Sequence, residues 1–185
     1  MADKPFLTDI KTLRERARQH IENGAITSGY TADLPTVIRL LNEALATEIV
    51  CVLRYRRHHF TASGIHAESV AAEFLQHANE EQGHGDLIAQ RIVQLGGEPN
   101  FNPEGLLTRS HAEYDDSADL IEMIKEDLVA ERIAIDSYRE MINYINNDDT
   151  TTRRMLEGIL AMEEEHADDL VTLLQEVGAS KATTA

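Results

Sequence analysis

The sequence contains a single cysteine, no tryptophan, four prolines and ten glycines in 185 residues. One cysteine, Cys51, cannot form an intrachain disulfide, so we expect an intracellular, cytoplasmic protein. No apolar run approaches the roughly 18 residues of a membrane-spanning helix, and the N-terminus has no apolar signal segment. A membrane is therefore not expected as a partner.

Positive charge is also scarce. Seventeen Lys and Arg face 33 Asp and Glu, which gives a net charge of -16. This charge favours solubility, and it also suits a surface that gathers cations. It repels nucleic acid, which is therefore not expected as a partner, although residues 1–20 are mildly basic and give a weak indication of DNA binding.

The few glycines and prolines fall mostly between long periodic segments, which predicts an all-α fold. A short helix is predicted near residues 9–23, begun by Thr8 and ended by Gly24. The predicted long helices span residues 34–61, 65–95, 117–146 and 150–177. Residues 98–116 are too many for a tight turn. At about 3.3 Å per residue they can run the length of a bundle, anchored by Leu106 and Leu107.

This pattern divides the chain into three segments. Residues 1–33 form an N-terminal extension with a short helix, residues 34–178 form a four-helix bundle, and residues 179–185 form a flexible tail. The inward face of each long helix follows from steps of three and four residues. The expected inward residues are Leu41, Leu45, Glu48, Val52 and Tyr55; Val70, Phe74, His77, Glu81, His84, Ile88 and Leu95; Ile124, Leu128, Glu131, Ile135, Tyr138 and Ile142; and Leu156, Ile159, Glu163, His166, Leu170, Leu173 and Val177.

The two helix pairs resemble one another at a nearly constant spacing, which indicates an internal duplication. At an offset of 83 the matches are Glu43 with Glu126, Leu45 with Leu128, Glu48 with Glu131 and Tyr55 with Tyr138. At an offset of 82 they are Glu81 with Glu163, His84 with His166, Asp86 with Asp168 and Gly96 with Gly178.

Acidic residues interrupt these apolar faces, and a buried carboxylate is costly unless it is paired or binds a metal. Two helices each carry one such glutamate, and the other two each carry a Glu-x-x-His motif on one face. This is the ligand set of di-iron and di-manganese carboxylate bundles. Carboxylates bridge two hard divalent ions, and imidazole suits iron. The alternative is a set of buried glutamates that are neutralised by His and Arg. The candidate metal ligands are Glu48, Glu81, His84, Glu131, Glu163 and His166.

Two divalent ions balance the four negative charges of this set. Without metal, the carboxylates repel one another and are expected to hold protons at a raised pKa.

The segment from Leu41 to Tyr55 resembles the first bundle helix of bacterioferritins. The motifs Glu81-Gln82-Gly83-His84 and Glu163-Glu164-Glu165-His166 resemble their two paired-ligand motifs. The resemblance covers residues 34–177 and implies a ferritin-like four-helix bundle with a long B–C crossover. It also implies a di-iron ferroxidase centre, with two Fe per subunit. Glu48, Glu81 and His84 would bind one half and Glu131, Glu163 and His166 the other, with Glu81 and Glu163 as bridges.

Two features depart from bacterioferritins. Gln82 stands where they place the haem-binding Met, so haem is not expected. Only about eight residues follow Val177, too few for their fifth helix, which favours a smaller shell. Together with the N-terminal extension, this resembles the Dps-like mini-ferritins and implies a homo-oligomer, expected as a dodecamer, although 24 subunits stay open.

The implied function is a ferroxidase that oxidises Fe(II) with hydrogen peroxide or oxygen and mineralises Fe(III) inside a protein cage. One alternative is a rubrerythrin-like peroxidase or manganese catalase without storage, although one cysteine cannot build a rubredoxin module. Another is a DNA-protecting structural shell, against which the acidic composition argues.

Several further residues each have more than one possible role. Tyr55 and Tyr138 each lie seven residues after a lone ligand glutamate. Each can donate a hydrogen bond to a metal ligand or give up an electron. Tyr55 matches a bacterioferritin tyrosine beside the metals, so it joins the catalytic candidates.

His77 is either a core histidine with its hydrogen bonds satisfied or an extra metal ligand. Glu80 is an exposed helical glutamate or lines a cavity. Cys51 is expected to be a small buried side chain. His58 and His59, near a helix end, indicate no site.

Overall fold

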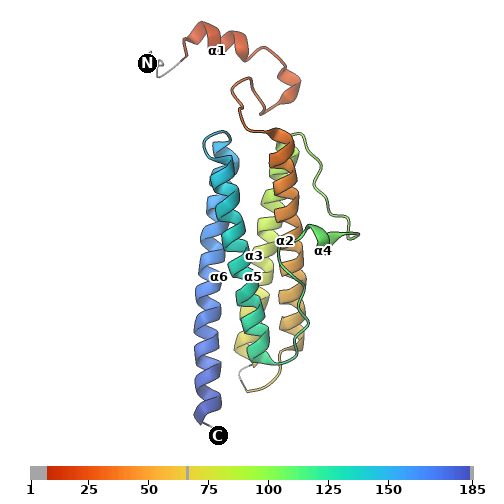
Figure 1. Cartoon of the computed structure of the whole chain (residues 1–185), viewed down its shortest axis with the longest axis vertical. Helices are drawn as coiled ribbons and strands as arrows, with labels where there is room; N and C mark the ends of the chain where they lie inside the picture. The colour runs from red at the N-terminus through yellow and green to blue at the C-terminus, as the bar shows by residue number, and fades with distance from the viewer. Residues whose placement is uncertain (1–7, 66, 184–185) are drawn as a thin grey trace.

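The computed structural model describes residues 8–65 and 67–183, and its core is a bundle of four long helices (Figure 1). The bundle helices are α2 (Leu34–Thr61), α3 (Ala67–Gln94), α5 (Leu120–Ile145) and α6 (Thr150–Thr183). The shorter elements are α1 (Ile10–Arg16), the 3₁₀ helix η1 (Ile21–Asn23) and α4 (Leu106–Arg109). The all-α bundle fold predicted from the sequence is confirmed.

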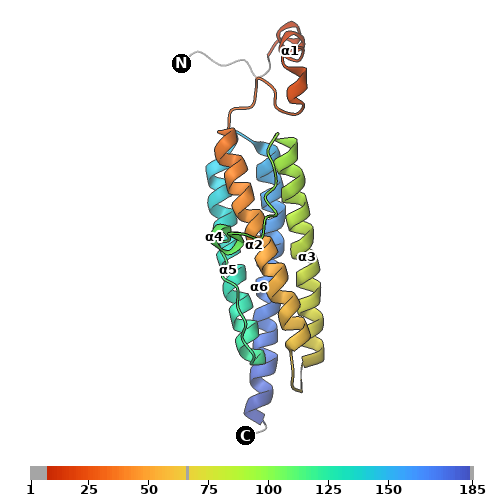
Figure 2. The same cartoon turned by 90° about the vertical axis from the view of Figure 1, so that its right-hand side faces the viewer.

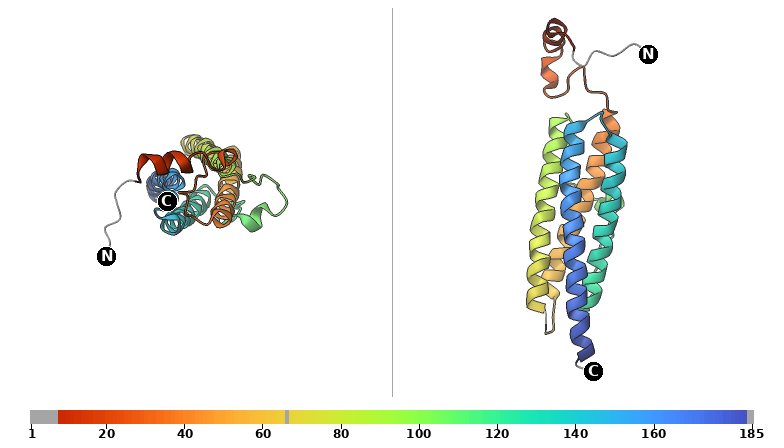
Figure 3. Two further views of the ribbon diagram at one scale, coloured as in Figure 1. Left: turned by 90° about the horizontal axis from the view of Figure 1, so that it is seen from above. Right: turned by 90° about the vertical axis from the view of Figure 1, so that its left-hand side faces the viewer.

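The chain builds the bundle from two helical hairpins. α2 packs on α3, and α5 packs on α6. The connection between the hairpins carries α4 and runs along the side of α2 and α5 (Figure 2). Seen from the opposite side, α6 lies in front of the bundle beside α3, and the connection does not cross it (Figure 3, right). The α2–α5 side is therefore covered, and the α3–α6 side is left open.

The helix ends follow from local residue types. Pro35 occupies the first turn of α2, where its missing N–H costs nothing. The Asp119 carboxylate caps α5 by accepting from the Ile121 amide at 3.0 Å. Gly96, after α3, and Asn146, after α5, adopt φ values of 74° and 48°, a left-handed conformation that stops a helix.

The leading helix is shorter than the sequence indicates. α1 ends at Arg16, and His20 then takes a left-handed φ of 51° before η1. Asp9, and not Thr8, caps α1, because its carboxylate accepts from both the backbone amide and the hydroxyl of Thr12. The predicted cap was therefore wrong. Residues 1–7 of the predicted N-terminal extension lie outside the described residues.

The last helix is longer than the sequence indicates. α6 continues to Thr183, so residues 179–183 of the expected tail are helical. Gly178 weakens a helix but does not end it, and good helix formers such as Ala179 and Ala182 follow it without a proline. Residues 184–185 lie outside the described part. The three-segment division of the chain stays a prediction.

The connection between the hairpins is held by polar contacts more than by leucines. Leu107, an expected anchor, is 61% exposed. The backbone amide of Asn100 instead donates to the Asn42 side chain at 2.7 Å, and that of His111 donates to the Thr47 hydroxyl at 3.0 Å. These two hydrogen bonds fix the connection against α2.

Two apolar clusters fill the bundle, one on each side of the buried glutamates. One contains Leu45 and Ile159, and the other contains Phe74 and Leu170. The layer between them holds the carboxylates, so the core places these charges where water does not reach. Within the described residues, no helix is both long and apolar enough to cross a membrane.

Candidate metal centre

The predicted ligand residues come together halfway along the bundle. α2 contributes one glutamate and α5 another, while α3 and α6 each contribute a glutamate and a histidine one turn later. Every one of these side chains is buried. The six residues are Glu48, Glu81, His84, Glu131, Glu163 and His166. Their role as metal ligands stays a prediction.

The six residues form two overlapping groups. In each group, potential ligand atoms of four residues lie within 4.8 Å of one another. The first group combines Glu48 and His84 with Glu81 and Glu163, and the second combines Glu131 and His166 with the same two glutamates. Each of the two groups could hold one cation, with Glu81 and Glu163 shared between them. The sharing matches the bridging roles that the bacterioferritin resemblance implies.

Both histidines present Nδ1 to the carboxylates. His84 Nδ1 lies 3.1 Å from Glu163 Oε1, 3.3 Å from Glu81 Oε2 and 3.4 Å from Glu48 Oε2. The Nδ1 atom of His166 lies 3.5 Å from Glu81 Oε1 and 3.7 Å from Glu163 Oε2. Each imidazole is therefore placed to give one nitrogen ligand to one cation position.

Several atoms of this centre are buried without a hydrogen-bond partner. They include both oxygens of Glu163, one oxygen each of Glu48, Glu81 and Glu131, and Nδ1 of His166. An unsatisfied buried polar atom costs about 1–3 kcal/mol, and more when it is charged. Because these atoms converge on the same space, a pair of divalent cations would satisfy them together. The donor set therefore fits two metal ions.

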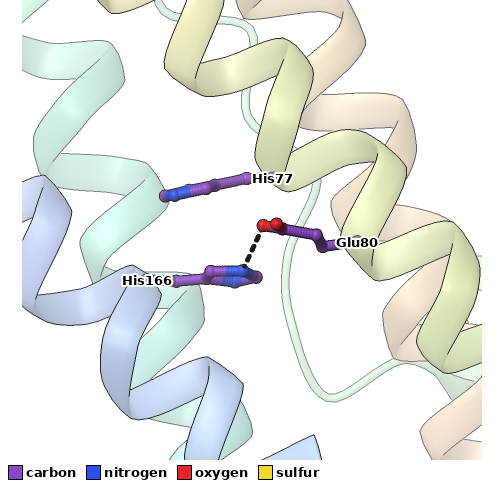
Figure 4. Close-up of side chains that lie close together, drawn as sticks. All are labelled: His77, Glu80 and His166. Atoms are coloured by element: carbon purple, nitrogen blue, oxygen red, sulfur yellow. Dashed lines mark hydrogen bonds and ion pairs between the residues drawn. The ribbon is translucent and has the colours of Figure 1, made fainter.

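A carboxylate outside the ligand set orients His166. Glu80 Oε2 lies 3.0 Å from His166 Nε2, and Figure 4 shows Glu80 reaching the edge of that ring. When Nε2–H donates to Glu80, the lone pair of Nδ1 points at the cation position. Glu80 therefore has a structural role beyond that of an exposed helical glutamate.

The two tyrosines connect the hairpins through the ligand glutamates. Tyr55 on α2 donates its hydroxyl hydrogen to Glu131 on α5, and Tyr138 on α5 donates to Glu48 on α2. Each tyrosine bonds the glutamate of the other hairpin. Both tyrosines are buried. Each hydroxyl binds one oxygen of its glutamate, and the second oxygen of Glu48 and of Glu131 has no hydrogen-bond partner and is available to a cation.

His77 joins this network from α3. Its Nδ1 lies 3.2 Å from the Tyr55 hydroxyl oxygen. Its ring stacks on that of His166, with centroids 4.1 Å apart and planes inclined by 20° (Figure 4). His77 is therefore in contact with the centre, although it belongs to neither group of four.

The protonation of the metal-free centre reflects burial and crowding. Burial, together with Glu163 and Glu48, raises the pKa of Glu81 well above its usual range. Burial is also the main cause that raises the pKa of Glu131 to about 7. Burial opposes the charge on His84, but the nearby carboxylates of Glu163, Glu48 and Glu81 outweigh it and raise the pKa of His84 to about 12. The pKa of Glu163 departs from the expected rise, because the nearby imidazoles of His166 and His84 outweigh the effect of burial and lower it. The protons held by the other groups are those that cations would replace.

A buried polar cluster that was not predicted from the sequence lies next to the centre. Asp127 accepts from Arg54 at 3.3 Å and pairs with His58 Nδ1 at 2.7 Å, and all three side chains are buried. The available signal was that Asp127 lies four residues before Glu131, on the same face of α5. Leu128 was expected on that face but is only partly buried. Cys51 is buried as expected, against Ala112 and Ala130.

Both the sequence and the fold of this chain are similar to those of known proteins. The ferritin-like domain family matches residues 38–179. The bacterioferritin-related protein of Bacteroides fragilis, described as a dodecameric thioferritin, superposes with a TM-score of 0.78 at 33% identity, over 82% of this chain and 91% of that one.

Two relatives show similar identity in sequence. The bacterioferritin of Mycobacterium tuberculosis is 31% identical over 142 residues, which cover 76% of this chain and 85% of the relative. A nutrient stress-induced DNA-binding protein of Synechococcus is 34% identical over 130 residues, which cover 69% of this chain and 74% of the relative.

Proposed function

The chain belongs to the ferritin-like domain family, and we propose that it is a ferroxidase that oxidises Fe(II) within each subunit and stores the product as Fe(III) mineral. The observation that carries the proposal is the pair of four-residue groups sharing Glu81 and Glu163. Such a centre holds two cations side by side.

The electron balance explains why two positions are useful. Each Fe(II) substrate ion loses one electron, and one hydrogen peroxide accepts two electrons and two protons to become two waters. Two ions that react together therefore reduce one peroxide completely, without releasing a one-electron radical product. The oxidant is hydrogen peroxide or oxygen. With oxygen, the two electrons of the iron pair and two protons reduce one O2 to one hydrogen peroxide.

The residues of this chain supply positioning and charge. The four glutamates neutralise two Fe(II) ions, and the shared carboxylates of Glu81 and Glu163 hold the ions together. Tyr55 and Tyr138 fix the terminal glutamates, and Glu80 fixes the ring of His166. Tyr55 also lies close enough to serve as an electron donor when an oxidising equivalent is left over. The apolar clusters on both sides keep bulk water away from the centre.

Storage requires a closed shell, and we propose one of about twelve subunits. The dodecameric protein of Bacteroides fragilis supports this number. The acidic character of the chain suits a shell that draws cations to its surface and holds them inside.

A second candidate function is DNA binding, which the name of the Synechococcus relative favours. The basic residues available for it lie mainly on the N-terminal extension, such as Arg14 and Arg16 of α1. The net charge of -16 opposes it. A gel-shift titration at low salt decides this point, because retardation that disappears in an Arg14→Glu/Arg16→Glu variant would support DNA binding.

The ferroxidase proposal is tested by oxidation of anaerobically loaded Fe(II) with hydrogen peroxide, followed by Fe(III) absorbance. We expect Glu163→Gln to lose the rapid phase, because it removes a carboxylate shared by both positions. Glu165→Gln is the matched control, since Glu165 is exposed two residues away on the same helix. Rapid oxidation that persists in Glu163→Gln, at the rate of the control, would overturn the assignment.

A further inference from the structure

One group of buried and half-buried residues beside the candidate metal centre is not repeated by the internal duplication. The internal repeat preserves the six ligand residues at offsets of 83 and 82. At the offset of 82, however, Glu73 matches Met155, His77 matches Ile159, and Asp169 matches Leu87. The three residues lie on helices of both hairpins, and each has an apolar residue at the matching position of the repeat.

These three residues face one another between α3 and α6. His77 Nε2 lies 3.4 Å from Glu73 Oε1 and 3.7 Å from Asp169 Oδ2, and the three ligand atoms lie within 4.8 Å of one another. The His77 side chain is 0% exposed, whereas those of Glu73 and Asp169 are 29% and 45% exposed. The group therefore joins a fully buried imidazole to two carboxylates that reach the solvent.

The hydrogen bonds around His77 determine which of its nitrogens is free. Tyr55 uses its hydroxyl hydrogen for Glu131, so its oxygen accepts from His77 Nδ1–H. In the neutral imidazole the lone pair is then on Nε2, which is buried without a hydrogen-bond partner. A lone pair that faces two carboxylates is repelled by both of them. A cation between the three groups removes that repulsion.

We propose that Glu73, His77 and Asp169 form a third divalent-cation site, separate from the two positions that share Glu81 and Glu163. One imidazole nitrogen and two carboxylates suit a first-row transition metal ion such as Fe(II), Mn(II) or Zn(II). The donation of the other ring N–H, here to Tyr55, is typical of a histidine that binds a metal.

The location of this site suits a role in iron transfer, and this role rests on the proposed ferroxidase function. It lies on the α3–α6 side of the bundle, which the connection between the hairpins leaves open (Figure 3, right). The His77 ring also stacks directly on His166 of the pair (Figure 4). A cation held there stands between the solvent and the buried centre. The site is a waypoint through which iron passes between the pair and the space outside the bundle.

Anomalous diffraction locates the ions directly. Crystals soaked in Zn(II), with data collected on both sides of the zinc edge, are expected to show a peak about 2.0–2.1 Å from His77 Nε2. Asp169→Asn and Glu73→Gln should lose this peak and keep those of the pair. The matched controls Asp168→Asn and Glu68→Gln change exposed acids on the same helices and should keep all peaks. No peak at His77 while the pair is filled would overturn the third site.

The two proposals fail in different ways. If the pair stays empty while zinc fills the His77 site, the ferroxidase proposal is the one that fails. The waypoint role is tested by repeated additions of Fe(II) and peroxide. Asp169→Asn should oxidise the first two irons per subunit at the wild-type rate and slow the later additions. Equal rates in Asp169→Asn and Asp168→Asn throughout would remove the waypoint role.

Discussion

The hydroxyl of Tyr138 on α5 donates a hydrogen bond to the carboxylate of Glu48 on α2. Tyr55 and Glu131 repeat the contact in the opposite direction. The two hairpins are therefore joined by a reciprocal pair of bonds at the level of the buried carboxylates. The residues that fix the hairpins together are also those that position the terminal ligands.

Removal of the Tyr138 hydroxyl tests this connection. In Tyr138→Phe the buried Glu48 oxygen loses its donor, so we expect the metal-free protein to lose about 1–3 kcal/mol of unfolding free energy. Urea denaturation of metal-free protein measures the change. Tyr144→Phe is the control, because Tyr144 is 53% exposed and should change little. Equal stability of the two variants would show that the bond contributes nothing.

Metal affinity should rise with pH. Without metal, the surrounding carboxylates raise the pKa of His84 to about 12, and burial raises the pKa of Glu81 well above its usual range, so both groups favour their protonated forms. A bound cation needs both groups deprotonated, so binding releases protons. Each released proton strengthens the apparent affinity about tenfold per pH unit. Calorimetry with Mn(II) in buffers of different ionisation enthalpy measures the release. An affinity that is flat or falls as pH rises would contradict the protonation described for the centre.

Haem should be absent from the purified protein. Gln82 lies exposed on α3, and its amide donates to Asp86 at 3.2 Å. An amide offers a poor iron ligand where bacterioferritins offer a thioether. The absorbance spectrum of protein expressed with ample haem checks this prediction, which a Soret band of stoichiometric intensity would refute.

The assembled protein should be a cage of about twelve subunits whose formation is helped by salt. At a charge of -16 per subunit the chains repel one another, and salt screens this repulsion. Apolar contact must supply the attraction, and Ile10, Leu13 and Ile21 of the N-terminal segment are exposed in the single chain. Native mass spectrometry and electron microscopy measure the assembly. A monomer or dimer at working concentration would remove storage from the proposed function.

Helical periodicity and the repeat were enough to predict the bundle and the convergence of the six candidate ligand residues. Those residues interrupt apolar faces in both halves of a duplicated fold, so their inward position follows from spacing alone. For residues that the internal repeat does not duplicate, the contact partners could not be predicted. The partners of His77 and Asp127 depend on the rotation of α3 against α6 and of α2 against α5. Packing sets that rotation, and no single helix reveals it.

The ends of the elements were predictable only in part. Pro35 marked the start of α2, which begins at Leu34 as expected. The predicted last helix ends at residue 177, but Gly178 adopts an ordinary helical conformation and α6 continues to Thr183. A glycine ends a helix when it takes a left-handed φ, as Gly96 does after α3, and the sequence does not specify φ.

Anomalous diffraction at the iron edge tests most directly whether one subunit holds two cations that share Glu81 and Glu163. Crystals are soaked anaerobically in Fe(II), and anomalous maps are calculated for the wild type and for Glu163→Gln. We predict two peaks in the wild type, one beside Glu48 and His84 and one beside Glu131 and His166, and weakening of both in the variant. A single peak among these residues, or none, would contradict the account.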